Sequence, residues 1–172
     1  SVAHTNLAIL DNTFLNLRYD AGLAYRHRVM ALNGASDSIV ANNTVSNYEG
    51  FVTTASPGSY RLQIVSNTLF QCMGSLQFGT SSGTAGGLLQ REYDGISAGS
   101  VIAWNIIYNG PPYPSNMFQA CALYITRDDG SGGGSGFNDV KVHNNTLYEI
   151  ACVFNWISGH GGGNNIEVYD NI

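Results

Sequence analysis

Three segments of this 172-residue chain carry residues whose types and spacing suit acid–base chemistry. One segment combines a cation with two nearby carboxylates, the second holds the only adjacent pair of carboxylates, and the third holds a histidine among glycines. The residues concerned are Arg91, Glu92 and Asp94, then Asp128 and Asp129, then His160. A carboxylate pair and an imidazole are the groups that proteins use most often to move protons.

Three chemistries can use such a set. Paired carboxylates hydrolyse a glycosidic bond, with one acting as acid and the other as base. Carboxylates together with loop carbonyls hold Ca²⁺. A β-elimination needs a base and a cation or Ca²⁺ that neutralises a uronate. Asp and Gly also form ordinary turns, so the sequence leaves open whether this protein is an enzyme.

We therefore divide the candidates into two roles. The candidate catalytic residues are Asp128, Asp129 and His160. The candidate substrate-binding residues are Arg91, Glu92, Asp94, Tyr113 and Arg127. No residue is assigned to a metal, although Ca²⁺ fits the carboxylate-rich loops.

The elements that must position these loops come from one phrase that occurs six times. Each copy centres on an Asn, with a β-branched residue three places before it and, where the chain continues, an apolar residue two places after it. The intervals range from 24 residues (Asn43 to Asn67) to 40 residues (Asn105 to Asn145). The six central residues are Asn12, Asn43, Asn67, Asn105, Asn145 and Asn171. Repeats of roughly 20–50 residues are typical of a solenoid or array.

The phrase predicts a strand, a corner and a second strand. Asn tolerates the left-handed backbone region better than other non-glycine residues, so we expect the central Asn to form the bend. Stacked copies then bring one Asn above the next at the strand spacing of about 4.8 Å, where their amides form a hydrogen-bonded ladder.

A third strand is expected between successive phrases. The strand-like stretches are residues 24–30, 50–54, 75–78, 122–126 and 152–156. Residues 79–99 and 109–118 are expected to be long loops. The predicted fold is an all-β, right-handed, single-stranded parallel β-helix of about six coils, with its handedness taken from the general rule for parallel crossovers.

The Asn corner and three short strands per coil resemble the pectin-lyase-like β-helix superfamily. Members of that superfamily include pectate lyases, polygalacturonases, alginate-modifying enzymes and phage tailspikes. The resemblance covers nearly the whole chain and implies a polysaccharide as partner. Fold alone does not decide function.

This architecture predicts where the chemical groups meet. The segments that hold Glu92 and Asp94, Asp128 and Asp129, and His160 should leave the same edge of successive coils. Their side chains would then converge on one side of the molecule. A scaffold protein would leave them scattered.

Composition narrows the classes of function. Charged residues make up 11% of the chain, the net charge is −5, and only seven residues are basic. No basic stripe exists, which excludes a typical nucleic-acid-binding protein. No apolar run reaches the roughly 18 residues of a membrane span. The Gly-rich, charge-poor balance suits an extracellular or cell-surface solenoid.

Positions four and two before each Asn should point outward. In the first four copies these positions are mostly apolar, and they include Leu10, Ile39, Val65 and Val101. An exposed apolar strip marks an interface, so we expect a protein partner or the rest of a parent chain to cover it. This strip supports an alternative function, a non-catalytic structural or adhesive solenoid of a surface layer, fibre or spike.

Two further expectations concern the cysteines and the ends. Cys72, Cys121 and Cys152 fall near the start of the third strand in successive coils. We expect a buried thiol ladder, because stacked neighbours on parallel strands rarely satisfy disulfide geometry; the alternative is a disulfide between adjacent coils. Residues 1–172 should form a single domain without polar caps at either end, which indicates a segment of a longer chain.

Overall fold

The computed structural model describes residues 4–15, 28–32, 34–46, 50–54, 59–70, 86–91, 98–108, 121–125, 138–148, 152–156 and 164–172. Every regular element within these ranges is a β-strand, and every strand pair is parallel. The all-β class and the parallel strands predicted from the sequence are therefore confirmed.

The strands form three main sheets and one short pair. Sheet A comprises β2 (Ala8–Leu10), β6 (Ile39–Ala41), β9 (Gln63–Val65), β12 (Val101–Ala103), β15 (Asn138–His143) and β18 (Asn164–Tyr169). Sheet B comprises β3 (Thr13–Leu15), β7 (Thr44–Ser46), β10 (Thr68–Phe70), β13 (Ile106–Tyr108) and β16 (Thr146–Tyr148). Sheet C comprises β4 (Arg28–Ala31), β8 (Gly50–Thr54), β11 (Gly86–Arg91), β14 (Cys121–Ile125) and β17 (Cys152–Trp156). The short pair is β1 (His4–Thr5) with β5 (Ala35–Ser36).

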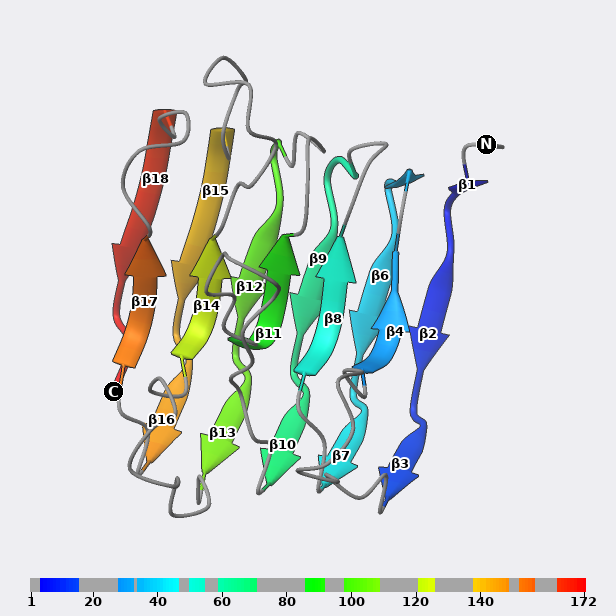
Figure 1. The fold of residues 1–172 in the computed structure, drawn as a ribbon, viewed down its shortest axis with the longest axis horizontal. Coiled ribbons are helices and arrows are strands. Elements are labelled where there is room, and N and C mark those ends of the chain that lie inside the picture. The colour runs from blue at the N-terminus through cyan, green and yellow to red at the C-terminus, as the bar shows by residue number, and fades with distance from the viewer. Residues whose placement is uncertain are drawn as a thin grey trace, which may run out of the picture.

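Strand order in space follows strand order in the sequence. The chain passes from sheet A to sheet B to sheet C, and the next strand of sheet A then pairs with the previous one. We call one such passage a coil. Figure 1 shows the coils side by side, with the N-terminal strands at one end of the molecule and β18 at the other.

Most of the predicted third strands are present. Residues 50–54 and 152–156 match β8 and β17, and residues 122–126 overlap β14. The third coil differs from the prediction, because its sheet C strand is β11, which lies inside the segment 79–99 that was expected to be a loop. Residues 75–78 lie outside the described ranges. The β11 sequence begins Gly-Gly-Leu-Leu, and its glycines and lack of β-branched residues hid the strand.

The corner residue was assigned one position too late. Positive φ angles occur at the residue before each central Asn, and not at the Asn itself. These residues are Asp11, Asn42, Ser66, Trp104, Asn144 and Asp170, with φ between 51° and 57°. A second column of left-handed residues lies near the start of sheet A, at Asn6, Asp37, Arg61, Gly99, Asp139 and Asn165. The first four precede their sheet A strands, whereas Asp139 and Asn165 are the second residues of β15 and β18.

The central Asn residues form the predicted ladder. The side-chain amide of Asn67 donates to Oδ1 of Asn105 at 3.0 Å, and the backbone N–H of Asn67 donates to the same oxygen at 2.9 Å. The same two bonds join every neighbouring pair from Asn12 to Asn171. The amide of Asn67 also donates to the carbonyls of Val40 and Val65. The four inner members of the ladder are buried, and these hydrogen bonds supply the partners that their buried amide groups need.

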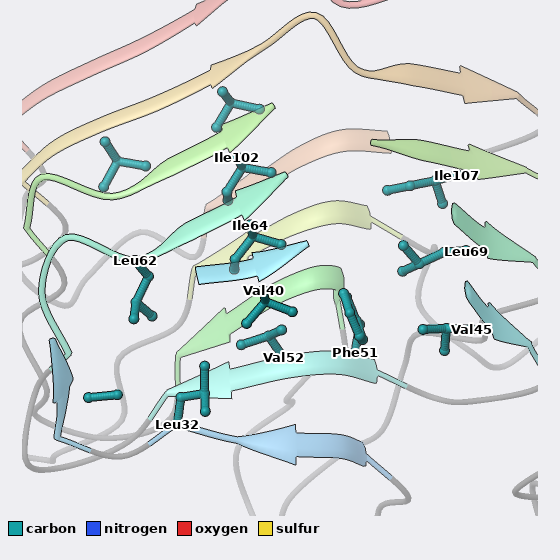
Figure 2. Packing of buried hydrophobic residues seen from close by; sticks show 13 residues of the cluster. Leu32, Val40, Val45, Phe51, Val52, Leu62, Ile64, Leu69, Ile102 and Ile107 are labelled. Atoms are coloured by element: carbon teal, nitrogen blue, oxygen red, sulfur yellow. The ribbon is translucent and has the colours of Figure 1, made fainter. Parts of the chain in front are cut away.

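The hydrophobic core lies between the sheets. Figure 2 shows Val40, Ile64 and Ile102 stacked on successive strands of sheet A, with Val45 and Leu69 stacked likewise on sheet B. Phe51 and Val52 of β8 are fully buried, and Leu32 after β4 is nearly so. The β-branched position three before each Asn thus faces inward as the sequence predicts, and only Val168 in β18 is exposed.

Serine replaces an apolar residue at two inward positions. Ser38 and Ser100 are buried in the position five before the Asn. The Ser38 hydroxyl donates to the carbonyl of Ser36 and accepts from the N–H of Leu7. Ser100 accepts from the N–H of Leu62. The hydroxyl satisfies a backbone donor of the preceding coil, which explains how a polar residue is tolerated there.

Cys121 and Cys152 are direct register partners at the start of β14 and β17. This pairing confirms that Cys121 and Cys152 occupy the same position in successive coils. Cys72 lies outside the described residues.

Candidate functional site

The structure places the backbone of only one of the predicted site residues. Arg91 is the last residue of β11. The others lie outside the described ranges, namely Glu92, Asp94, Tyr113, Arg127, Asp128, Asp129 and His160. Their roles stay predictions.

The strand ends that lead into these segments lie next to one another. Arg91 pairs with Ile125 at the end of β14, and Ile125 pairs with Trp156 at the end of β17. The segments with Glu92, Asp128 and His160 therefore start from aligned carboxyl ends of three neighbouring parallel strands. This agrees with the expectation that they leave one edge, whereas convergence of the side chains stays a prediction.

Among the described residues, no group of three or more His, Cys, Asp or Glu side chains lies close enough to hold a metal ion. The carboxylates for which we considered Ca²⁺ belong to the segments outside the description.

Within the described part of the chain, the clearest surface feature is a row of three aromatic rings across the last coils. The imidazole of His143 and the phenol of Tyr169 stack with centroids 4.9 Å apart and planes 6° apart. The indole of Trp104 meets His143 edge to face, with centroids 5.1 Å apart and planes at 85°. We call Trp104, His143 and Tyr169 the aromatic row.

Strand register explains why these rings meet. Ala103, His143 and Tyr169 occupy one column of sheet A, because Ala103 pairs with His143 and His143 pairs with Tyr169. Trp104 follows Ala103 at the corner, where the backbone N–H of Trp104 donates to the backbone carbonyl of His143 at 3.3 Å. Successive parallel strands lie about 4.8 Å apart, which is the distance at which rings on neighbouring strands stack.

Trp104 differs from its counterparts in the other coils. Five of the six residues at this corner are Asp, Asn or Ser, which fit a left-handed backbone with a short polar side chain. Trp104 has φ 55° and remains 56% exposed. A large apolar side chain in this backbone conformation costs energy, and its exposure shows that burial does not offset much of that cost.

Polar groups accompany the aromatic row. Lys141 and Glu167 face each other on β15 and β18, with Nζ and Oε2 3.2 Å apart, and both side chains are more than 40% exposed. His143 Nδ1 lies 2.7 Å from Oδ1 of Asn144. Because the amide oxygen is an acceptor, the neutral imidazole carries its hydrogen on Nδ1, and Nε2 is left as an acceptor.

The outward apolar strip is only partly exposed. Leu10 is exposed, whereas Ile39, Val65 and Val101 are half-buried. Ala41 and Ala103 were expected to face solvent, yet both are buried. Each alanine is short and pairs with a longer side chain on either side, such as Val65 and His143 beside Ala103. A partner over this strip stays a prediction.

The corner before sheet A carries an ion pair. Arg61 donates to both carboxylate oxygens of Asp37, at 2.5 and 2.6 Å. This hydrogen bonding holds the pKa of Asp37 below its ordinary value and raises the pKa of Arg61. A Cβ at Gly99 in the next coil would lie 3.1 Å from Cγ of Arg61, so the glycine both accepts the positive φ and leaves room for the arginine stem.

Sequence reasoning missed the aromatic row as a unit. The rule that positions two before each Asn point outward places His143 and Tyr169 on the outer face, but no role was predicted for them. The available signal was the single Trp in a column of Asp, Asn and Ser. Recognising it required the correct corner position, one residue before the Asn.

Comparison of the chain with protein-family models, with curated proteins and with solved structures finds no match. In the portion that the structure describes, no helix has the length and apolar character that crossing a membrane requires.

Proposed function

We propose that this chain forms a right-handed parallel β-helix, on the cell surface or secreted, that binds a polysaccharide across the aromatic row. The proposal joins three parts, which are the fold, the binding surface and the location. Each has its own support.

The support for a β-helix is the repeated passage through three parallel sheets and the continuous Asn ladder. Parallel crossovers in one sheet are right-handed in nearly all proteins, which gives the proposed hand. The resemblance to pectin-lyase-like proteins rests on the Asn corner and on three strands per coil. It remains part of the proposal.

The observation that carries the binding function is Trp104. Strained backbone conformations that are not offset by burial of the side chain occur most often at functional sites. The indole is exposed and its plane lies at 85° to that of its neighbour His143. The indole thus offers an aromatic face that the stacking of His143 on Tyr169 does not cover.

Sugar rings suit this arrangement. The C–H face of a sugar packs on an aromatic face, and the hydroxyl groups at its rim need donors and acceptors nearby. The row offers the Tyr169 hydroxyl and His143 Nε2, with Lys141 and Glu167 alongside. Aromatic platforms with a few polar groups are the usual composition of small-molecule sites.

The low charge content and the richness in Gly support an extracellular or surface location. Cleavage of the polysaccharide would depend on Asp128, Asp129 and His160. Binding through the aromatic row does not require it.

Affinity electrophoresis in gels that contain single polysaccharides tests the proposal. We expect at least one polymer to retard the chain, and Trp104→Ala to abolish most of that retardation. Tyr148→Ala is the matched control, because Tyr148 is also an aromatic residue, is 62% exposed and lies on sheet B. If no polysaccharide retards the chain, or if both variants behave alike, binding at the row is rejected and the structural, adhesive alternative gains.

A further inference from the structure

Given the proposed function, we infer that the ligand of the aromatic row is an uncharged, hydroxyl-rich polysaccharide and not a uronic acid polymer. The resemblance to pectin-lyase-like proteins points the other way, since many of those proteins act on acidic polymers. The inference rests on the charges around the row, on the tautomer of His143 and on the direction of the row.

The charges around the row disfavour an anion. Lys141 is the only Lys or Arg in the described parts of the last three sheet A strands and their corners, and Glu167 already neutralises it at 3.2 Å. Asp170 stands exposed at the corner that follows β18, in the same column of corners as Trp104. The structure gives Asp170 no ion pair among the described residues. Lys141, Glu167 and Asp170 together carry a formal charge of −1, and the whole chain carries −5.

A uronate carboxylate would therefore have to displace Glu167 from Lys141 while approaching a second carboxylate. Juxtaposed like charges oppose binding, whereas a neutral sugar leaves the ion pair intact. Neutral sugars can also use the outer lone pairs of Glu167 and Asp170 as acceptors for their hydroxyl groups.

The tautomer of the neutral His143 ring also favours a hydroxyl group over a carboxylate. Asn144 Oδ1 lies 2.7 Å from Nδ1, so the hydrogen of the neutral ring sits on Nδ1. In this neutral ring, Nε2 accepts a hydrogen bond. A sugar hydroxyl can donate to it, but a carboxylate has no hydrogen to give.

The direction of the row indicates a chain and not a single sugar. Trp104 lies at the corner after β12, His143 lies on β15 and Tyr169 on β18, so the row runs across three successive coils. Two strand intervals of about 4.8 Å make the row roughly 10 Å long. The ligand should therefore extend along the direction in which β12, β15 and β18 are stacked (Figure 1).

The test uses the full 172-residue chain and two sets of soluble polymers. The neutral set is β-glucan, mannan and xylan, and the acidic set is polygalacturonate and alginate. Binding is measured by isothermal titration calorimetry at low and at physiological ionic strength. We expect the chain to bind one neutral polymer with little dependence on salt, and Trp104→Ala to weaken that binding about tenfold or more.

A charge variant separates the ligand class from the site itself. Glu167→Gln with Asp170→Asn removes two carboxylates and leaves Lys141 free. We expect this variant to acquire affinity for polygalacturonate or alginate at low salt and to lose that affinity at high salt.

The failures of the two proposals are distinguishable. If the wild-type chain prefers an acidic polymer, and Trp104→Ala abolishes that binding, the neutral-ligand inference is overturned and the proposed function stands. If no polymer binds, or if binding ignores Trp104→Ala, the proposed function fails and the inference fails with it.

Discussion

The indole ring of Trp104 lies edge to face against the imidazole ring of His143, with centroids 5.1 Å apart, although the two residues belong to different coils. The contact exists because β12 and β15 pair in register and the corner after β12 turns the indole toward the next strand. One consequence concerns stability.

Replacing Trp104 by Asn should leave the protein as stable as before or more stable. Asn fits the left-handed backbone, which removes a strain of about 1 kcal/mol, while the lost ring contact is worth about the same or less. Thermal and urea unfolding of the two proteins measure the difference. A loss of more than about 1 kcal/mol in the free energy of unfolding would assign the indole a structural role instead.

The Asn ladder predicts that the same substitution, Asn to Asp, destabilises the protein at one residue and has little effect at its neighbour. Asn43 is buried, and its amide donates to Asn67 Oδ1 and to the carbonyls of Ile9 and Ala41. Asn43→Asp puts a carboxylate against these three oxygens with no hydrogen to donate. We expect the free energy of unfolding to fall by about 3 kcal/mol or more, as measured by urea denaturation.

Asn42→Asp is the control for that variant. Asn42 is exposed at a left-handed corner where two other coils carry Asp11 and Asp170. We expect a change within about 0.5 kcal/mol. Equal effects of the two substitutions would show that the ladder does not stabilise the coils as described.

The two faces of β9 predict a second matched pair. Ile64 is fully buried between the sheets, and Val65 next to it is half-buried on the outer face. Ile64→Ala should cost about 2–5 kcal/mol, because it leaves a cavity in the core. Val65→Ala should cost clearly less, because solvent already reaches the side chain. A reversed order in denaturant midpoints would mean that the faces of β9 are assigned wrongly.

The Asp37–Arg61 pair predicts a pH dependence in the acid range. Hydrogen bonding by Arg61 lowers the pKa of Asp37 from its ordinary 3.8. A carboxyl group whose folded-state pKa is depressed stabilises the protein fully above its unfolded pKa, and this stabilisation is lost as the pH falls through the folded value. The stability difference between wild type and Asp37→Asn should therefore be constant above about pH 4 and shrink below it.

Melting temperatures of wild type, Asp37→Asn, Arg61→Gln and the double variant, measured from about pH 2 to pH 7, check this prediction. High salt should reduce the difference, since both side chains are exposed. If the single Asp37→Asn substitution changes stability equally at every pH, the ion pair does not form in solution.

The position of each strand in sheet A followed from short-range pattern alone. A β-branched residue three places before an Asn is a local signal, and it identified the inward face at Val40, Ile64 and Ile102 without any knowledge of their neighbours. The ladder followed as well, because identical residues at one corner must stack when coils stack.

The strand of the third coil in sheet C could not be found in this way. Gly86–Arg91 has weak intrinsic strand preference, and it is a strand because β8 and β14 pair with it on both sides. The burial of Ala41 and Ala103 also depended on neighbours, since their exposure is decided by the length of the side chains in adjacent coils.

The sequence by itself thus determined the repeat, the inward columns and the all-β class, because each depends on residues a few places apart. Only the tertiary structure decided which residue of each corner is left-handed and which rings meet on the surface. Trp104, His143 and Tyr169 are far apart in the chain and share no motif. They form one row because parallel pairing holds three strands in register, and register is a property of the stacked coils and not of any one of them.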